Sequence, residues 1–152
     1  MQTTLRAEFC ISGVSLHIGR EVKIKVCPAP AKHGVKFIRT DVLNQNPIVE
    51  ALYSSVSDTK FSTKISNKDG VGVQTIEHLM AALAGTGVHN ALVEIDGPEL
   101  PILDGSSREF VKKILLVGKQ SLEEPVGGFK VTKEIEVREG MAWAKFVPAK
   151  SL

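Results

Sequence analysis

The stretch TIEHLMAALAGTGVHNALVEI, residues 75–95, decides the fold class because it joins a helical pattern to a strand pattern. In its first half the apolar side chains recur three and four positions apart, as on one face of a helix: Ile76, Leu79, Met80 and Leu83. Thr75 is the predicted N-cap of this helix, and Gly85 and Gly87 are predicted to end it. Residues 90–95, NALVEI, are typical of a strand.

Upstream of this stretch the sequence predicts further strands. Residues 20–29, REVKIKVCPA, alternate apolar and polar side chains, which indicates a half-buried strand. Residues 34–38, GVKFI, are predicted to be its pairing partner after a short turn. Residues 60–65 are a candidate strand that leads into a turn at residues 67–70.

Downstream, a second helix is predicted to begin within residues 104–109 and to end at Gly118. Ser106 and Glu109 have the spacing of a capping box, in which both side chains satisfy backbone N–H groups at the start of a helix. The predicted apolar face of this helix consists of Phe110, Val111, Ile114 and Leu115.

The last part of the sequence is predicted to leave this domain. Residues 120–128 have the composition of a linker, and residues 129–147 look like a hairpin with its turn near Gly140. Because a two-stranded hairpin is marginal alone, we expect the sequence to stop inside a second domain. The predicted fold class is therefore α+β. A two-layer domain of sheet and helices covers residues 1–124, and a linker with the orphan opening hairpin of a truncated second domain covers residues 125–152.

Composition excludes several classes of protein. The 152 residues carry 19 Lys and Arg against 17 Asp and Glu, a net charge of +2 that is too small to make nucleic acid the main partner. Cys10 and Cys27 lack C-x-x-C spacing, so neither a disulfide framework nor a cysteine metal site is expected. Arg6 and Glu8 interrupt the region where a signal peptide would be apolar, and no window reaches the roughly 20 apolar residues of a membrane span. We therefore expect a cytoplasmic protein without a transmembrane segment.

The main candidates for chemistry are Glu77 and His78, in the first turn of the first predicted helix. A zinc hydrolase needs a neutral imidazole to hold the metal and a nearby carboxylate to take a proton from water on that metal. Adjacent helical residues point about 100° apart, so one side chain can face the metal while the other reaches the water. Zinc lowers the pKa of such water to about 7, which makes hydroxide available at neutral pH.

On the residues alone, two interpretations of this pair stay open. The helix dipole favours a first-turn glutamate, and an incidental histidine beside it is the more common meaning of the dipeptide. Catalytic zinc also usually has three protein ligands, and the sequence contains no H-E-x-x-H. His17 is predicted to be buried and bonded to backbone, and His33 and His89 to lie in surface loops. The residues thus indicate a possible but incomplete metal hydrolase.

Several segments resemble, in the same order, signatures of the UDP-3-O-acyl-N-acetylglucosamine deacetylase family, zinc amidases of lipid A synthesis in Gram-negative bacteria. Residues 75–85, TIEHLMAALAG, resemble its T-[VI]-E-H-L-x-A-A-L-x-G signature. Residues 13–19, GVSLHIG, are similar to its N-terminal G-x-x-L-H-x-G, and residues 99–106, ELPILDGS, to its E-[IL]-P-I-[ML]-D-G-S turn. Residues 28–41 and 55–59 also look like segments of the family.

The resemblance implies a fold of two similar domains, a β-α-α-β sandwich with zinc at the domain interface. It implies that His78 is a zinc ligand and that Glu77 is the general base that activates water. The implied substrate is a UDP-linked acylated amino sugar, UDP-3-O-(3-hydroxyacyl)-N-acetylglucosamine, which loses its N-acetyl group in the committed step of lipid A biosynthesis. His17 and Asp104 match family motifs and are interpreted as structural.

The sequence also departs from the family pattern. The family's H-K-x-x-D helix, which supplies the remaining histidine and aspartate ligands, and the later histidine proposed as general acid have no counterpart here. Lys60 and Ser62 stand where apolar residues are expected in the active-site insert. We therefore expect this chain to be inactive without a second domain that completes the site. The alternatives are a non-catalytic interaction or binding module of the same fold, and an unrelated small α+β domain.

Overall fold

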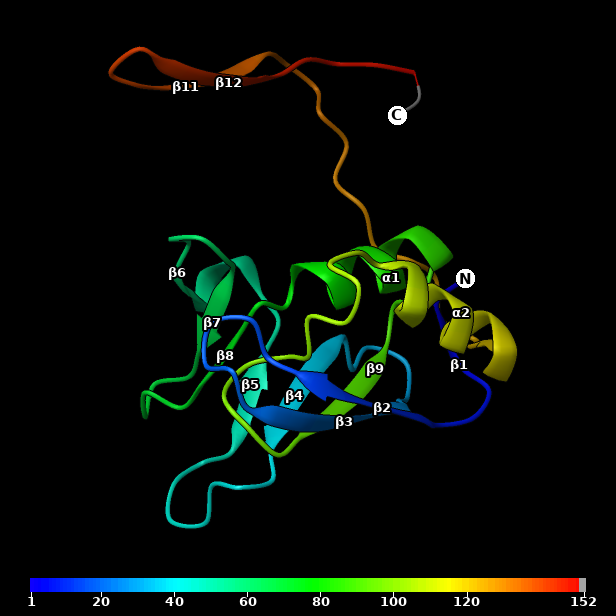
Figure 1. The fold of residues 1–152 in the computed structure, drawn as a ribbon. Coiled ribbons are helices and arrows are strands. Elements are labelled where there is room, and N and C mark those ends of the chain that lie inside the picture. Colours follow the sequence, from blue (N-terminus) through cyan, green and yellow to red (C-terminus); the bar gives the residue numbers. More distant parts are fainter. Residues whose placement is uncertain (151–152) are drawn as a thin grey trace.

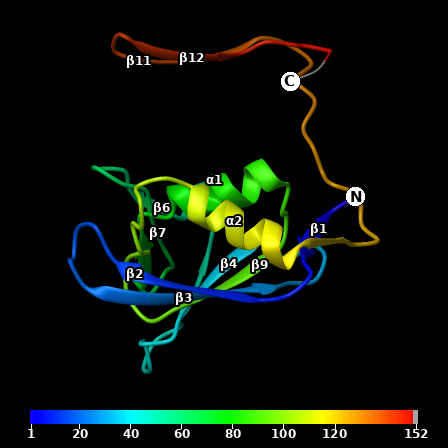
Figure 2. The same cartoon turned by 45° about the vertical axis from the view of Figure 1, so that its right-hand side comes forward.

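The computed structural model describes residues 1–150, and their fold is α+β, as predicted. Two helices lie on one face of a five-stranded sheet, and a separate hairpin lies beyond the helices (Figure 1). The order of the sheet is β2 (Phe9–Val14), β3 (Glu21–Pro28), β9 (Ala91–Ile95), β4 (Val35–Arg39) and β5 (Ile48–Glu50). The helices are α1 (Glu77–Thr86) and α2 (Arg108–Val117), and the rotated view in Figure 2 shows them side by side above the sheet.

The strand pattern of residues 20–29 is confirmed, because Val22, Ile24 and Val26 of β3 are buried beneath the helices. The predicted pairing of β3 with residues 34–38 is wrong. Strand β9 lies between β3 and β4, antiparallel to the first and parallel to the second. The alternate residues of β9 are completely buried, which suits a central strand with a hydrogen-bonded neighbour on each side.

Helix α1 presents the predicted apolar face, since Leu79 and Leu83 are buried in the core. Gly87 ends the helix in the left-handed conformation with φ of 71°, where a residue without Cβ fits without strain. The predicted N-cap is wrong: the helix begins at Glu77, and Thr75 lies before it with φ of 59°. The Thr75 hydroxyl donates to the Glu99 carboxylate rather than accepting from the helix.

Helix α2 ends at Gly118 as predicted, but the capping box does not form. The Glu109 carboxylate accepts from Lys112 Nζ at 2.7 Å, because a lysine one turn along the helix is within its reach. The Ser106 hydroxyl instead accepts from the N–H of Arg108. Of the predicted apolar face, Phe110 and Ile114 are fully buried, Val111 packs against the core, and Leu115 is 66% exposed, contrary to the prediction.

Two small sheets flank the central one. Strand β1 (Thr3–Leu5) pairs with β10 (Lys119–Ser121), so the first residues of the predicted linker 120–128 are a strand. A three-stranded insert consists of β6 (Val56–Asp58), β7 (Lys64–Ser66) and β8 (Gly72–Gln74), preceded by a short 3-10 helix, Tyr53–Ser55. The candidate strand at residues 60–65 therefore overlaps β7 only at its end, while the turn at residues 67–70 is confirmed by the hydrogen bond from the Gly70 N–H to the Asn67 carbonyl.

The predicted C-terminal hairpin is confirmed as β11 (Ile135–Glu139) and β12 (Ala142–Phe146). Every residue of both strands is exposed, and an extended segment separates the hairpin from the helices (Figure 1). The Gln2 side chain donates to the carbonyl of Pro125 at 3.1 Å, near the proposed boundary between residues 1–124 and 125–152. Within residues 1–150, no helix is long and apolar enough to cross a membrane.

Candidate functional site

Glu77 and His78 lie in the first turn of α1, and both side chains are half-buried. A carboxylate is favourable there, because the first N–H groups of a helix are unpaired and carry partial positive charge. Oxygen Oε2 of Glu77 accepts from the backbone N–H of Thr63 at 3.1 Å. The insert therefore holds one oxygen of this carboxylate, and among residues 1–150 the other oxygen, Oε1, makes no hydrogen bond to protein.

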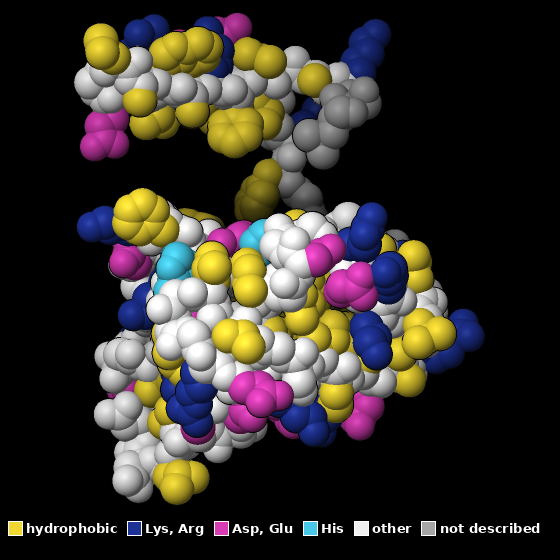
Figure 3. All heavy atoms as spheres, viewed as in Figure 1, with side chains coloured by type: hydrophobic (Ala, Val, Ile, Leu, Met, Phe, Trp, Pro, Cys, Tyr) yellow, Lys and Arg dark blue, Asp and Glu magenta, His cyan; other side chains and the backbone are white. Residues whose placement is uncertain are grey.

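The four histidines are not gathered into one metal site. Within residues 1–150 no group of three or more His, Cys, Asp or Glu side chains is placed to hold a metal ion. His17 is exposed, contrary to the prediction, and its backbone N–H donates to the carboxylate of Glu99. His33 and His89 lie in loops, as predicted. Figure 3 shows histidine side chains beside hydrophobic ones on the face that lies beneath the hairpin.

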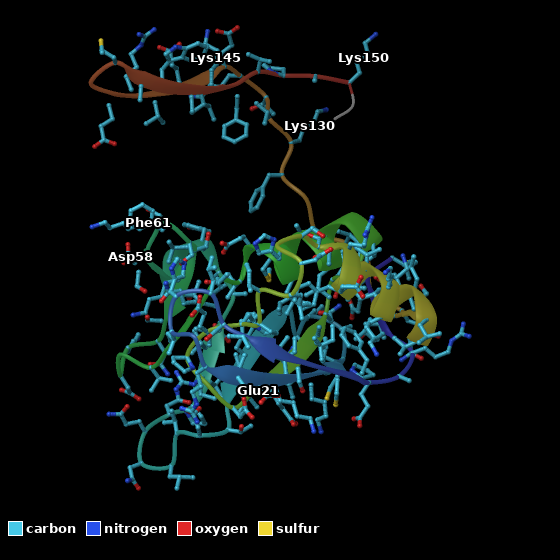
Figure 4. The ribbon with its side chains drawn as sticks, in the orientation of Figure 1. Glu21, Asp58, Phe61, Lys130, Lys145 and Lys150 are labelled. Carbon is cyan, nitrogen blue, oxygen red and sulfur yellow. The ribbon has the colours of Figure 1, made fainter. Side chains whose placement is uncertain are left out.

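The insert reaches the candidate site through Thr63 and displays other residues to solvent. Ser62 is buried, and its hydroxyl accepts from the Gln74 side chain at 2.9 Å. Phe61 is 84% exposed, and Figure 4 shows it with Asp58 at the outer end of the insert. The two residues that differ from the family pattern, Lys60 and Ser62, thus lie in different environments. Ser62 is buried and hydrogen-bonded, whereas Lys60 lies on the exposed tip of the insert, with Nζ 5.7 Å from the centre of the Phe61 ring.

A partly exposed ion pair lies where the insert meets the central sheet, and its arginine contacts the insert. Arg39 of β4 donates from Nε and Nη2 to the two oxygens of Asp41, at 2.8 and 2.7 Å, and from Nη1 to the carbonyl of Gly72 in β8. The hydrogen bonds from Arg39 hold the pKa of Asp41 below its ordinary value. Through Gly72 this arginine contacts β8, the strand that precedes α1 in the chain.

One buried carboxylate near the site was not found by sequence reasoning. Glu99 is 1% exposed, and it accepts hydrogen bonds from the backbone N–H groups of His17 and Ile18 and from the Thr75 hydroxyl. A glutamate between prolines in an otherwise apolar segment is a signal of a buried charge, but its partners lie 24 to 82 residues away in the sequence. Only the fold brings these segments together.

Asp104 lies in the turn before α2 and has a local role. Its Oδ1 accepts from both the N–H and the hydroxyl of Ser106, at 3.1 and 2.9 Å. These bonds lower the pKa of Asp104. The contacts agree with the interpretation of Asp104 as a turn residue.

A surface cleft of about 870 Å³ opens between β5 and the insert. Its lining includes Lys36, Glu50 and Asn67 but neither Glu77 nor His78. Lys36 and Glu50 form an ion pair with each other, so the two charged groups are already partnered. The cleft is therefore separate from the candidate site.

Comparison with known proteins gives a consistent result. The sequence model of the family described as LpxC, UDP-3-O-acyl N-acetylglycosamine deacetylase, matches residues 2–152. The UDP-3-O-acyl-N-acetylglucosamine deacetylase of Shewanella halifaxensis is 42% identical over 151 residues, which are 98% of this chain and 48% of that protein. The protein of the same name from Vibrio cholerae serotype O1 is 43% identical over 149 residues, 97% of this chain and 48% of its own.

The chain thus spans about half the length of the curated relatives that it matches. The matched region includes both Glu77 and His78 and continues through the hairpin. On this evidence the chain belongs to the LpxC family of UDP-3-O-acyl N-acetylglycosamine deacetylases.

Proposed function

We propose that this chain supplies part of the active site of a zinc-dependent deacetylase whose substrate is UDP-3-O-acyl-N-acetylglucosamine, in the committed step of lipid A biosynthesis. Family membership over residues 2–152 supports the substrate class. The observation that carries the proposal is the first turn of α1, where Glu77 is held through Oε2 while Oε1 stays available beside His78. A cytoplasmic location is proposed together with this activity.

The residues present fit zinc as a partial donor set. His78 offers one half-buried imidazole, a common zinc ligand, but a catalytic zinc usually has three protein ligands. Since residues 1–150 contain no cluster of three candidate ligands, we propose that the remaining ligands come from polypeptide outside these 152 residues. The chain matches 48% of its relatives' length, which supports this division. When bound, zinc would supply a Lewis acid and a lower pKa for water.

Within this chain Glu77 is the residue proposed to move a proton. Its Oε1 accepts a proton from the water that attacks the carbonyl carbon of the N-acetyl group. The carbon–nitrogen bond then breaks, acetate leaves, and the sugar nitrogen becomes an amine after taking a proton. The acid that protonates this nitrogen is proposed to lie outside this chain, and the 152 residues alone are therefore expected to be inactive.

A second candidate function is a non-catalytic binding module of the same fold. It is favoured by the hairpin, on which Trp143 and Phe146 are exposed, and by the absence of a three-ligand metal cluster in residues 1–150. Under this alternative Glu77 and His78 would have no role in turnover.

The experiment uses a chimera in which this chain is followed by the part of the Vibrio cholerae relative that it does not match. Its folding is verified by one cooperative thermal transition, and acetate release from UDP-3-O-acyl-N-acetylglucosamine is measured. We expect E77Q to lower kcat by about 100-fold or more while zinc content is unchanged, because a general base contributes about that much. H78A is expected to lose both zinc and turnover.

E109Q is the matched control, because Glu109 is an acidic residue in the first turn of the other helix and pairs with Lys112 at the surface. It should leave kcat unchanged. A folded, zinc-loaded chimera that is equally active with E77Q would overturn the proposed role, and acetate release by the 152 residues alone would contradict the division of the site.

A further inference from the structure

Three segments that are distant in the sequence meet at the carboxylate of Glu99. The backbone N–H of His17 donates to both oxygens at 3.1 Å, the N–H of Ile18 donates to Oε2 at 3.0 Å, and the Thr75 hydroxyl donates to Oε1 at 2.8 Å. Within residues 1–150 no Lys, Arg or His forms an ion pair with Glu99. A buried carboxylate without a counter-charge is an expensive way to stabilise a turn, so a role beyond stability is indicated.

The connection to the candidate site is Thr75, which is 2% exposed and lies two residues before Glu77. Its φ of 59° is unusual for a β-branched residue and turns the chain from β8 into α1. The backbone on its N-terminal side is also fixed, because the Gln74 N–H donates to the Pro98 carbonyl and the Leu100 N–H donates to the Gln74 carbonyl. The segment that contains Glu99 therefore holds Gln74 through backbone hydrogen bonds and Thr75 through its side chain.

We propose that Glu99 is a positioning residue for Glu77 and His78 and acts through the Thr75 hydroxyl; this rests on the proposed function. The bond from Thr75 to Glu99 holds the backbone in its left-handed conformation and so sets the direction in which α1 begins. That direction brings Oε2 of Glu77 to the Thr63 N–H and leaves Oε1 available. Glu99 is too deeply buried to touch a substrate, and among its hydrogen-bond partners Thr75 is the one that lies next to α1.

The first arm of the test is an NMR comparison of the 152-residue chain with its T75V, T75S and T86V variants. The Thr63 amide resonance reports the bond to Glu77, and the His78 ring resonances report the other member of the pair. T75V removes the hydroxyl and is expected to shift the Thr63 and His78 resonances. T75S keeps the hydroxyl and is expected to restore resonances close to those of the wild type.

T86V is the matched control, because Thr86 lies at the other end of α1 and its hydroxyl donates to the Ala82 and Leu83 carbonyls. Like T75V, this variant removes the hydrogen bond of a threonine hydroxyl, but it does so at the far end of α1 and should leave the Thr63 and His78 resonances unchanged. Equal effects of T86V and T75V, or no effect of T75V, would overturn the proposal.

The second arm measures kinetics in the chimera. We expect T75V and E99Q to lower kcat by about 10- to 100-fold, as the loss of residues that orient metal-site groups commonly does, with KM nearly constant. T75S should retain most of kcat. A rise in KM with constant kcat, or equal losses in T75S and T75V, would contradict a positioning role for the hydroxyl.

The two proposals fail in different ways. Full turnover by E77Q would overturn the proposed function, while the NMR arm would still report whether Thr75 orients the pair. Loss of turnover in E77Q with none in T75V would overturn only the positioning role. If E99Q does not fold, the kinetics of T75V alone test the proposal, because T75V leaves the hydrogen bonds from the His17 and Ile18 N–H groups to Glu99 in place.

Discussion

At the scale of single residues, the candidate site is supported by polar side chains that are held by several hydrogen bonds. Arg39 donates hydrogen bonds to both oxygens of Asp41 and to the Gly72 carbonyl. The bonds to Asp41 lower the pKa of its carboxyl group relative to that in an unfolded chain. A carboxyl group with a depressed folded pKa stabilises the fold above its unfolded pKa. That contribution is lost as the pH falls through the folded pKa.

D41N should therefore lower the free energy of unfolding at pH 7 by about 1 kcal/mol, a modest amount because the pair is partly solvated. The difference from wild type should shrink as the pH falls through the lowered folded pKa of Asp41, and it should vanish once Asp41 is protonated in both states. Urea unfolding at a series of pH values measures the difference in free energy of unfolding between D41N and wild type. D69N, at an exposed turn position, is the control. A deficit that persists undiminished at the lowest pH would show that charge is not the cause.

Of the residue-level predictions from the sequence, the place of Glu77 and His78 in the first turn of a helix is confirmed. Glu77 and His78 could be selected because they are adjacent and follow a helix-start pattern. The role of Thr75 could not be predicted, because a threonine before a helix usually caps it, whereas this one donates to a carboxylate 24 residues away. Whether Glu77 and His78 perform chemistry stays a prediction.

At the scale of elements, sequence patterns located both helices, the hairpin and the sheet strands β3, β4 and β9. They missed β2 and β5 of the same sheet, and they could not determine which strands are neighbours. Strand β3 and strand β9 were both predictable from alternating or apolar residues. The position of β9 between β3 and β4 depends on a crossover through α1 that makes β4 and β9 parallel neighbours, and no local window contains that connection. Leu115 is a second case that a local pattern could not predict. It lies on the apolar face expected from the sequence, but α2 buries only part of that face and leaves Leu115 exposed.

Replacing two glycines by alanine should change the free energy of unfolding in opposite directions. A Cβ on Gly72 of β8 would lie 2.7 Å from Ser66 Oγ and 3.0 Å from the Ile65 carbonyl, so G72A should cost about 1–3 kcal/mol. Gly85 lies in α1 with nothing within 4 Å of such a Cβ, and G85A should add up to about 1 kcal/mol. Chemical unfolding of both variants and of the wild type measures these two changes in the free energy of unfolding. A G72A protein as stable as wild type would contradict the close packing of β7 against β8.

At the scale of the whole molecule, the chain consists of a packed body and a hairpin that the body does not cover. The hairpin exposes Val137, Trp143 and Phe146, and the chain spans about half of each curated relative. A hairpin of this kind is marginal in water unless further structure packs on it. Within residues 1–150 no three candidate ligands are placed to hold a metal ion. This observation and the uncovered hairpin agree with the proposal that a second domain, supplied by further polypeptide, completes the zinc site.

Zinc titration by calorimetry tests this central claim most directly. The 152 residues alone should bind zinc weakly and without defined stoichiometry, because one imidazole cannot form a closed or catalytic site. The chimera should bind one zinc tightly, and H78A should abolish that binding. Tight, stoichiometric zinc on the 152 residues alone, or a chimera whose zinc affinity is unchanged by H78A, would contradict the account.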